Sequence, residues 1–363
     1  MEKNELIYWM AFSSIDSIGP QKIIKLAENF PNMKTAWRAT SPELRRAGLG
    51  EKDASIICES RGSIRPEKFL EKIEQSGISV VTIQDPNYPR RLKEIHSPPA
   101  LLYYRGRLPA NLDLGLAVVG TRKTSAYGRM VTPDLIGTIA RTGVVIVSGL
   151  ALGIDTLAHQ AAVDVGGKTI AVLGCGLDVL YPLANRLLAE KIIATGGCLV
   201  SEYPPGTKPL RQHFPARNRI ISGLSRGVLV IEGGENSGSL ITARCAIDQN
   251  RDVLAIPGNI TSPSSAGPNN LIKMGAKAVT SADDILTAVD LEMAEQYYKN
   301  SVILPASPEE EKLLSCIGRE PVHIDEIIQE CKLNTSIINS SLTMMEIKGI
   351  VRHLGGMYYI RSK

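Results

Sequence analysis

Residues 200 to 242 read VSEYPPGTKPLRQHFPARNRIISGLSRGVLVIEGGENSGSLIT, and this stretch carries both structural and chemical signals. Its second half is an apolar run, Gly227 to Ile231, that enters a Gly/Ser loop, which is typical of a buried strand and its turn. Its first half is expected to be a basic loop with one ring, made of Lys208, Arg211, His213, Phe214, Arg217 and Arg219. Cations, an aromatic face and free backbone N–H groups suit a nucleotide chain, although a solvated surface loop is the alternative.

Apolar, strand-like runs recur on both sides of this stretch. They lie at residues 78–83, 101–104, 116–119, 144–147, 169–173, 198–201, 227–231, 252–256 and 278–279. From Leu116 onward they alternate with helical stretches such as 127–142 and 183–195, which indicates parallel β-α-β units. The predicted fold class is α/β, with an extended Rossmann-like, doubly wound and mostly parallel sheet over residues 77–289.

Small residues follow many of the predicted strands. The loops in question are 120–122, 148–155, 174–176, 233–239 and 257–259. Parallel strands end at one edge of the sheet, so these loops should meet there and present N–H groups to an anion, although a tight turn alone also explains one such loop. The Gly-x-Gly-x-x-Gly fingerprint and the phosphate loop ending in Gly-Lys-Ser/Thr are both missing. NAD and ATP are therefore poorly supported, and we expect no cofactor.

Two smaller domains are expected to flank the sheet. Residues 1–76 read as short helices, and the repeated pattern of an apolar residue, Gly and a helix resembles a helix-hairpin-helix or sterile-alpha-motif module. That module could hold a phosphate or simply pack. After a linker at 290–306, residues 307–363 read as a winged helix with two strands joined at Gly355-Gly356. Its candidate reading helix, 336–347, has no Lys or Arg, so we do not expect it to read duplex DNA.

Composition limits the class of protein. The 363 residues are 44% hydrophobic and 21% charged, with a net charge of +4 that permits nucleic-acid binding without requiring it. No apolar run approaches the roughly 20 residues that cross a bilayer, and the N-terminus lacks a signal-peptide pattern, so a cytoplasmic protein without membrane partners is expected. The six cysteines are scattered without a Cys-x-x-Cys pair, which favours reduced thiols and no metal site.

Several long motifs together resemble the DNA-processing protein A family, known as DprA or Smf. They are SGLALGIDTLAHQAA, AVLGCGLDVLYP, GPNNLIKMGA and the stretch quoted first, extended by Ala243, and the resemblance spans roughly residues 80 to 285. It implies a homodimer that binds single-stranded DNA without catalysis. It further implies a role in natural transformation, in which incoming single strands are protected and the RecA recombinase is loaded onto them.

The resemblance also implies a set of DNA-binding residues. These are Arg122, Lys123, Ser148, Gly149, Arg211, Phe214, Arg217, Asn218, Arg219, Gly238 and Ser239. Two of them have a structural alternative. Phe214 could anchor its loop to the core instead of stacking on a base, and Arg122 could pair with a nearby acid such as Asp155 or Glu232.

Two other classes of function stay open at this stage. GGENSGS resembles the Gly-Gly-x-Gly-Thr loop of phosphoribohydrolases, which are nucleotide-binding enzymes with a Rossmann-like scaffold. In those enzymes a Glu one helical turn beyond the loop does the chemistry, whereas residues 241–244 here are Ile, Thr, Ala and Arg. An enzyme is therefore disfavoured. The third possibility is a protein-interaction adaptor with a degenerate nucleotide site.

Overall fold

The computed structural model describes residues 3–109, 112–289, 308–318, 320–331, 333–347 and 351–361. The chain forms two units, Met1–Glu295 and Gln296–Lys363, and the described residues of each have a hydrophobic core. The linker predicted at 290–306 lies outside the described residues.

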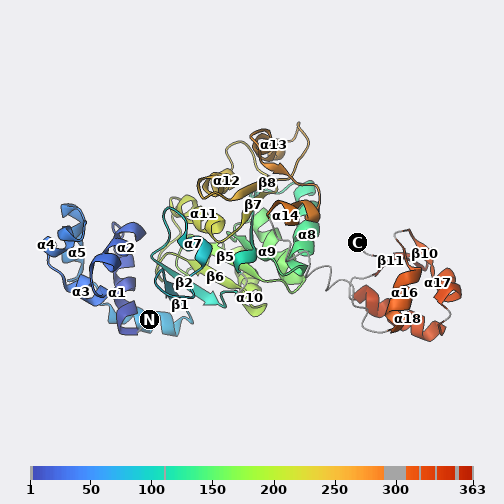
Figure 1. The fold of residues 1–363 in the computed structure, drawn as a ribbon, viewed down its shortest axis with the longest axis horizontal. Coiled ribbons are helices and arrows are strands. Elements are labelled where there is room, and N and C mark those ends of the chain that lie inside the picture. Colours follow the sequence, from blue (N-terminus) through green and yellow to red (C-terminus); the bar gives the residue numbers. More distant parts are fainter. Residues whose placement is uncertain are drawn as a thin grey trace. The chain divides into compact units, whose positions relative to one another are not determined.

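A nine-stranded sheet forms the centre of the first unit (Figure 1). Its strands are β1 (Ser79–Thr82), β2 (Leu101–Gly106), β3 (Gly115–Val119), β4 (Val145–Ser148), β5 (Thr169–Leu173), β6 (Cys198–Ser201), β7 (Gly227–Val230), β8 (Asp252–Ala255) and β9 (Lys277–Ala278). The order is β1-β2-β6-β5-β4-β3-β7-β8-β9. The β1–β2 and β2–β6 pairs are antiparallel and the others are parallel. Each predicted strand is present, and the mostly parallel α/β class is confirmed.

The strand order contains one reversal of direction. From β3 the chain adds β4, β5 and β6 on one side, then returns to place β7 against the other side of β3. The crevice at such a reversal, beyond the carboxyl ends of the two strands, is where ligands bind in open α/β sheets. The loops after β3 and β7 are therefore the first place to look for a site.

Helices cover both faces of this sheet. On one face, α8 (Ala126–Arg141), α9 (Ile154–Asp164) and α14 (Ala282–Ala288) pack over Leu116 and Val118 of β3. On the other face, α11 (His213–Gly223) and α12 (Gly238–Asp248) share a core with Ala117 and Val119. Successive side chains of a strand point to opposite faces, so an apolar strand requires cover on both.

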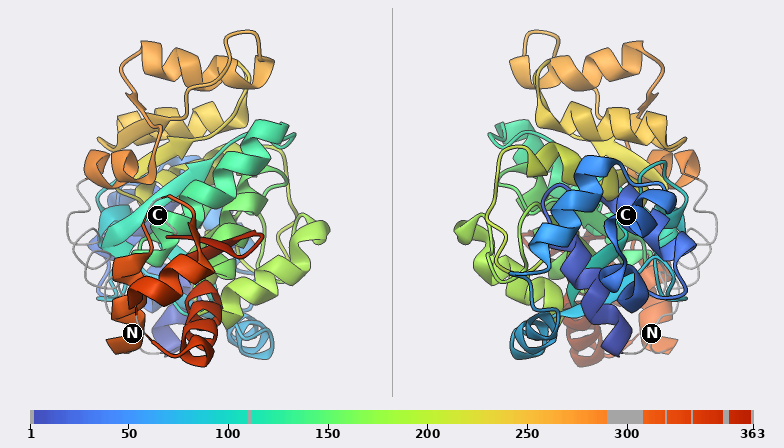
Figure 2. Two further views of the ribbon diagram at one scale, coloured as in Figure 1. Left: turned by 90° about the vertical axis from the view of Figure 1, so that its right-hand side faces the viewer. Right: turned by 90° about the vertical axis from the view of Figure 1, so that its left-hand side faces the viewer.

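Three further helices pack around the sheet and its other helices. They are α7 (Arg90–Lys93), α10 (Arg186–Ala194) and α13 (Ala266–Lys273), with 3-10 turns at Leu112–Leu114, Leu183–Asn185 and Pro263–Ser265. In both views of Figure 2, α13 (orange) lies beyond α12 (yellow), at the end of the sheet that carries β8 and β9.

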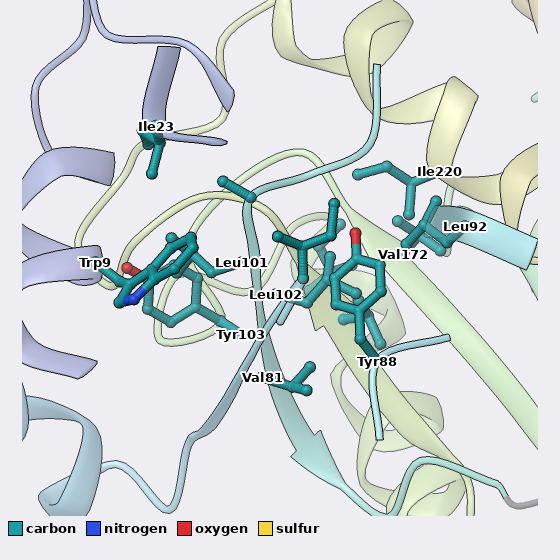
Figure 3. Close-up of a cluster of buried hydrophobic side chains, with 14 of the residues drawn as sticks. Trp9, Ile23, Val81, Tyr88, Leu92, Leu101, Leu102, Tyr103, Val172 and Ile220 are labelled. Carbon is teal, nitrogen blue, oxygen red and sulfur yellow. The ribbon is translucent and has the colours of Figure 1, made fainter. Parts of the chain in front are cut away.

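Six short helices precede the sheet. They are α1 (Lys3–Ser13), α2 (Pro20–Asn29), α3 (Met33–Arg38), α4 (Ser41–Arg46), α5 (Glu51–Ser60) and α6 (Glu67–Gln75). The helix α4 begins at Ser41, where Thr40 and Glu43 form a capping box. Figure 3 shows Trp9 of α1 beside Leu101 and Tyr103 of β2, and Ser13 hydrogen-bonds the Tyr103 hydroxyl at 2.9 Å. The helices and the sheet therefore share one core, and the domain boundary at 76/77 stays a prediction.

The second unit has the elements of a winged helix. It contains α16 (Pro308–Cys316), β10 (Val322–His323), α17 (Ile324–Cys331), α18 (Thr335–Ile347), β11 (Val351–Gly355) and β12 (Tyr358–Arg361), with strand order β10-β12-β11. The predicted hairpin at Gly355-Gly356 is confirmed, with both glycines at positive φ. The expectation of six reduced cysteines is wrong for two of them, since α16 and α17 bring Cys316 and Cys331 into a disulfide.

Among the described residues, no helix is both long and apolar enough to cross a bilayer. The described part of the chain also holds no group of three or more His, Cys, Asp or Glu side chains placed for a metal ion.

Candidate nucleic-acid interface

A cavity of about 600 Å³ opens at the reversal between β3 and β7. Loops that follow β3, β4, β5, β6 and β7 all contribute to its wall, as the small residues after these strands predict. It is lined by Val119, Gly120, Arg122, Ala151, Asp155, Tyr181, Arg211, Phe214, Pro215, Arg217, Asn218, Ile221, Ser237, Gly238, Ser239, Ile241 and Thr242. The predicted loop at 257–259, which follows β8, is not part of this wall.

Aromatic rings and a guanidinium meet on one side of this cavity. Phe214 and Tyr181 have ring centroids 5.7 Å apart and are tilted by 41°. The guanidinium carbon of Arg122 lies 5.7 Å from the Phe214 centroid, which is within cation–π range. Beneath the ring, a Cβ on Gly174 would lie 3.1 Å from Phe214, so the small residue there permits the close approach. Phe214 is thus half-buried and also borders open space.

Arg122 is not held by an acid in this structure. It is exposed, and no ion pair to it occurs within the described residues. The two acids considered as partners are occupied elsewhere. Glu232 accepts hydrogen bonds from Ser125 and Ser264, and Asp155 accepts from the backbone N–H groups of Gly149 and Ala151. The guanidinium of Arg122 is therefore available to an anion in the cavity.

Arg217 forms the floor of the cavity rather than its rim. It is 5% exposed and donates to the carbonyls of Gly149, at 2.9 Å, and of Val172. A Cβ on Gly149 would lie 2.6 Å from this guanidinium, so a side chain there would displace Arg217. Burial lowers the pKa of Arg217, and the neighbouring Asp155 carboxylate opposes that effect.

Asp155 is the acid opposite this guanidinium. Burial raises its pKa, whereas Arg217 and the two backbone N–H donors act in the opposite direction. Among the described residues that line the cavity, Asp155 is the one acid. This residue is 7% exposed, and its carboxylate is hydrogen-bonded. The exposed charge at the cavity mouth is therefore positive, from Arg122 and Arg211.

The N-terminus of α12 faces the same cavity. Ser237 caps the helix and contacts Ser239 through their hydroxyls at 2.8 Å. No atom lies within 4 Å of the position a Cβ would take on Gly238, so the first turn is open. A helix N-terminus favours anions because its N–H groups and its dipole both point outward.

One structural expectation for this region is wrong. Residues 213–223, expected to begin as a basic loop, form the helix α11. A helix turns about 100° per residue, so Arg217 and Arg219 point in directions about 200° apart. Arg219 accordingly leaves the cavity, and one guanidinium nitrogen donates to both Glu202 oxygens at 2.7 Å. The two arginines do not share a crevice.

The other predicted site residues divide into three groups. Gly238, Ser239, Asn218 and Arg211 line the cavity with Arg122, Phe214 and Arg217. Ser148 is fully buried and donates to the Val118 carbonyl at 2.6 Å, and Gly149 lies behind Arg217, so both support the wall. Lys123 is exposed beside the cavity but does not line it.

Sequence reasoning missed two exposed apolar residues of the wall. Tyr181, which is 45% exposed, follows β5, and Ile241, which is 40% exposed, lies in the first turn of α12. Tyr181 belongs to AVLGCGLDVLYP, one of the motifs that carried the resemblance, and this was a signal that could have identified it.

The chain resembles known protein families in sequence. Residues 79–290, more than half of the chain, match the family model described as DNA recombination-mediator protein A. The chain belongs to this family. Residues 300–357 match the family model described as the DprA winged helix domain.

Curated members of the DNA recombination-mediator protein A family align over most of the chain. Protein Smf of Synechocystis is 37% identical over 99% of this chain and 100% of its own length. DNA processing protein DprA of Bacillus subtilis is 42% identical over 74% of this chain and 90% of its own length. The solved DprA of Streptococcus pneumoniae has a TM-score of 0.66 at 41% identity, covering 79% of this chain and 98% of that one.

A second solved relative is described together with the ligand that it binds. DNA processing protein A from Helicobacter pylori has a TM-score of 0.52 at 31% identity, covering 60% of this chain and 96% of that one. Its structure is described as giving insight into a single-stranded DNA binding mode.

Proposed function

We propose that the cavity at the end of β3 and β7 binds single-stranded DNA without reading its sequence. The observation that carries the proposal is the combination of an accessible ring, Phe214, with Arg122 and Arg211, two exposed cations that have no acidic partner in the described residues. A base can stack on the ring while the cations hold flanking phosphates. The N-terminus of α12 adds further phosphate donors.

Sequence independence is supported by the polar groups of the wall. The Asn218 amide, which could read a base edge, is engaged with the Gly238 carbonyl and the Arg217 guanidinium. Stacking and phosphate contacts do not distinguish bases, whereas hydrogen bonds to base edges do.

We further propose that the protein is not an enzyme. Asp155, the acid in the wall, already accepts two backbone hydrogen bonds and faces a buried guanidinium. Such a carboxylate has little capacity left to act as a general base on a ligand. The first turns of α12 likewise present Ile241 and Thr242 to the cavity in place of an acid.

The proposed biological role follows from family membership. We infer that the protein acts as a cytoplasmic homodimer in natural transformation, where it protects incoming single strands and loads RecA onto them. Support comes from the family description as a recombination mediator and from the relatives named as DNA processing proteins.

Fluorescence anisotropy tests the binding proposal. Single-stranded and duplex probes of equal length and two unrelated sequences should be titrated at several salt concentrations. We expect tighter binding to the single strand, equal affinity for both sequences, and a linear fall of log affinity with log salt. Equal affinity for single strand and duplex, or no dependence on salt, contradicts the proposal.

The alternative of an enzymatic activity and the proposed biological role need separate assays. Release of free base or phosphate from a nucleoside monophosphate would support the phosphoribohydrolase alternative. Light scattering reports the oligomeric state, and RecA-dependent strand exchange on protein-coated DNA reports loading. A monomer that inhibits RecA at every concentration would contradict the recombination role while leaving strand binding intact.

A further inference from the structure

A second cavity, of about 780 Å³, lies on the other side of α11. Its wall combines the α1–α2 turn, α6, the start of β2, the loop after β6 and the first turns of α11. Phe214 and Arg217 of this helix face the first cavity, whereas His213, Ala216 and Arg219 face the second. One helix is therefore the shared wall of two cavities.

The wall of the second cavity contains a stacked aromatic pair. Tyr203 and His213 have ring centroids 4.1 Å apart and an interplanar angle of 22°. The position of His213 is fixed by a contact between its Nδ1 and the Gly174 carbonyl at 3.2 Å. A half-buried ring backed by another ring is a preorganised stacking surface for a planar base.

A free cation lies beside this pair. Lys208 is exposed and makes no ion pair within the described residues. The turn before it is rigid, because Thr207 donates to the Pro204 carbonyl, its own carbonyl accepts from Gly176 at 2.9 Å, and Gly206 donates to Asp178 at 2.7 Å. The base of the Lys208 side chain is therefore positioned before any ligand binds.

The other charges in this wall largely cancel. Glu202 is held by Arg219, and Lys72 of α6 donates to the Pro205 carbonyl at 2.9 Å and lies 3.9 Å from Asp178. Asp16, on the α1–α2 turn, is the remaining acid in the wall among the described residues. Of the lysines and arginines described in this wall, Lys208 is thus the one that no other group holds, and it lies in the loop before α11.

Both cavities border the start of α11. Arg211 lines the first cavity, and the next two residues, Gln212 and His213, line the second. The loop before α11 therefore contributes to both walls. Lys208 and Arg211 both lie in this loop, are exposed, and are available to hold phosphates.

We propose that the second cavity is an extension of the strand-binding site, in which a neighbouring nucleotide stacks on Tyr203 while Lys208 holds its phosphate. The inference rests on the proposed function of the first cavity. It assigns part of the DNA site to the boundary with the N-terminal helices α1, α2 and α6, which contribute the facing wall.

The test uses the full chain and oligothymidylates of about four and about sixteen nucleotides, because single-strand sites span this range. Lys208→Ala should leave the short probe unchanged and flatten the log–log salt slope for the long probe by about 0.7, the value for one single-strand phosphate. Tyr203→Leu should weaken the long probe roughly 5- to 100-fold, while Tyr203→Phe keeps the ring and the affinity. Lys34→Ala, an exposed lysine of α3, is the matched control.

Photocrosslinking supplies a readout that a purely structural role would not change. A single 5-iodouracil is moved stepwise along the long probe, and crosslinked residues are identified by mass spectrometry. We expect one position to crosslink to Phe214 or Tyr181 and a neighbouring position to Tyr203 or His213. Crosslinks confined to Phe214 and Tyr181, or a long-probe affinity that Lys208→Ala does not change, would overturn the extension.

The two proposals fail in different ways. If the short probe does not bind the unmodified protein and no crosslink to Phe214 or Tyr181 forms, the first cavity is not the strand site. If the short probe binds and Arg211→Ala weakens it, but the Lys208 and Tyr203 variants behave as the unmodified protein, then the extension alone is wrong.

Discussion

At the scale of single residues, Phe214 is the part of the site most directly tied to a base. Phe214→Ala should cost about 1–3 kcal/mol of single-strand binding free energy, because one stacking face is lost. The ring borders the cavity and is half-buried, so thermal stability should fall little. Phe214→Tyr is the control that keeps the ring. A large fall in melting temperature with affinity reduced only by the unfolded fraction would make Phe214 a core anchor instead.

Arg122 makes a separate and measurable contribution. Because it has no acidic partner within the described residues, Arg122→Ala should leave the melting temperature nearly unchanged. The salt slope for single-stranded DNA should flatten by about 0.7, since one phosphate contact is lost. Exposed Arg129, on the outer side of α8, provides a matched control. A folded variant with an unchanged slope would remove Arg122 from the DNA site.

His159 shows how a buried residue makes stability depend on pH. Its Nδ1 contacts Thr169 at 2.7 Å, and the Thr169 hydroxyl donates to the Ile146 carbonyl. The threonine must therefore accept, which places the proton of neutral His159 on Nδ1. Its Nε2 is buried without a partner in the described structure, and burial lowers the pKa to about 3.

The sign of the pH effect follows from that depressed pKa. The unfolded chain binds a proton at His159 near pH 6.5, whereas the folded chain binds it near 3, so stability falls as pH decreases through this window. Between pH 7 and pH 5 the loss should be about 2 kcal/mol. His159→Gln should reduce this slope in denaturant titrations. An identical slope in that variant would show that other groups cause the acid destabilisation.

At the scale of elements, the strands were predictable and one helix was not. Runs such as Thr169 to Leu173 are apolar throughout because both faces of the sheet are covered, and that pattern is visible in the sequence. In α11 the buried face includes Arg217 and Asn218, so the apolar period that identifies a helix is missing. Pro215, in the first turn, also suggested a loop, although a helix tolerates proline there.

The candidate site, like the fold, was predictable where it depends on the strands and not where it depends on α11. Residues in the loops after the strands, such as Arg122 and Gly238, line one cavity because topology brings strand ends together, and their role in DNA binding stays a prediction. The separation of Arg217 from Arg219 follows from the helix α11, which the sequence did not predict, and their partners Gly149 and Glu202 are distant in sequence.

The Arg219–Glu202 pair is the element-scale prediction, because it joins α11 to the end of β6. The two side chains are 19% and 16% exposed, and removing one strands the other in a partly buried position. A double-mutant cycle with Arg219→Ala and Glu202→Ala should give a coupling of about 1–3 kcal/mol in unfolding free energy. The solvated Arg186–Glu190 pair is the control and should couple by less than about 0.5 kcal/mol. A coupling energy in the Arg219–Glu202 pair as small as that of the control pair would contradict the prediction.

At the scale of the whole molecule, we place the proposed strand binding in the first unit. Both cavities lie within Met1–Glu295, and α18 of the second unit has no Lys or Arg along its length. A recognition helix without cations lacks the phosphate contacts that dominate affinity for DNA. We therefore expect the winged-helix unit to serve contacts with partners or packing.

Truncation tests this division, and the structure fixes where the cut should fall. Val289 is 2% exposed within the core beneath α8, and its carbonyl accepts from Arg226 at 3.4 Å. A chain ending at Glu295 keeps these contacts and should bind single-stranded DNA within about threefold of the full chain, a difference below about 1 kcal/mol. A chain ending at Ala288 is the matched control, and loss of the buried valine should destabilise it by about 1.5–3 kcal/mol. If the longer truncation melts normally but binds more than about tenfold more weakly, a loss of about 1.4 kcal/mol, the winged helix belongs to the DNA site.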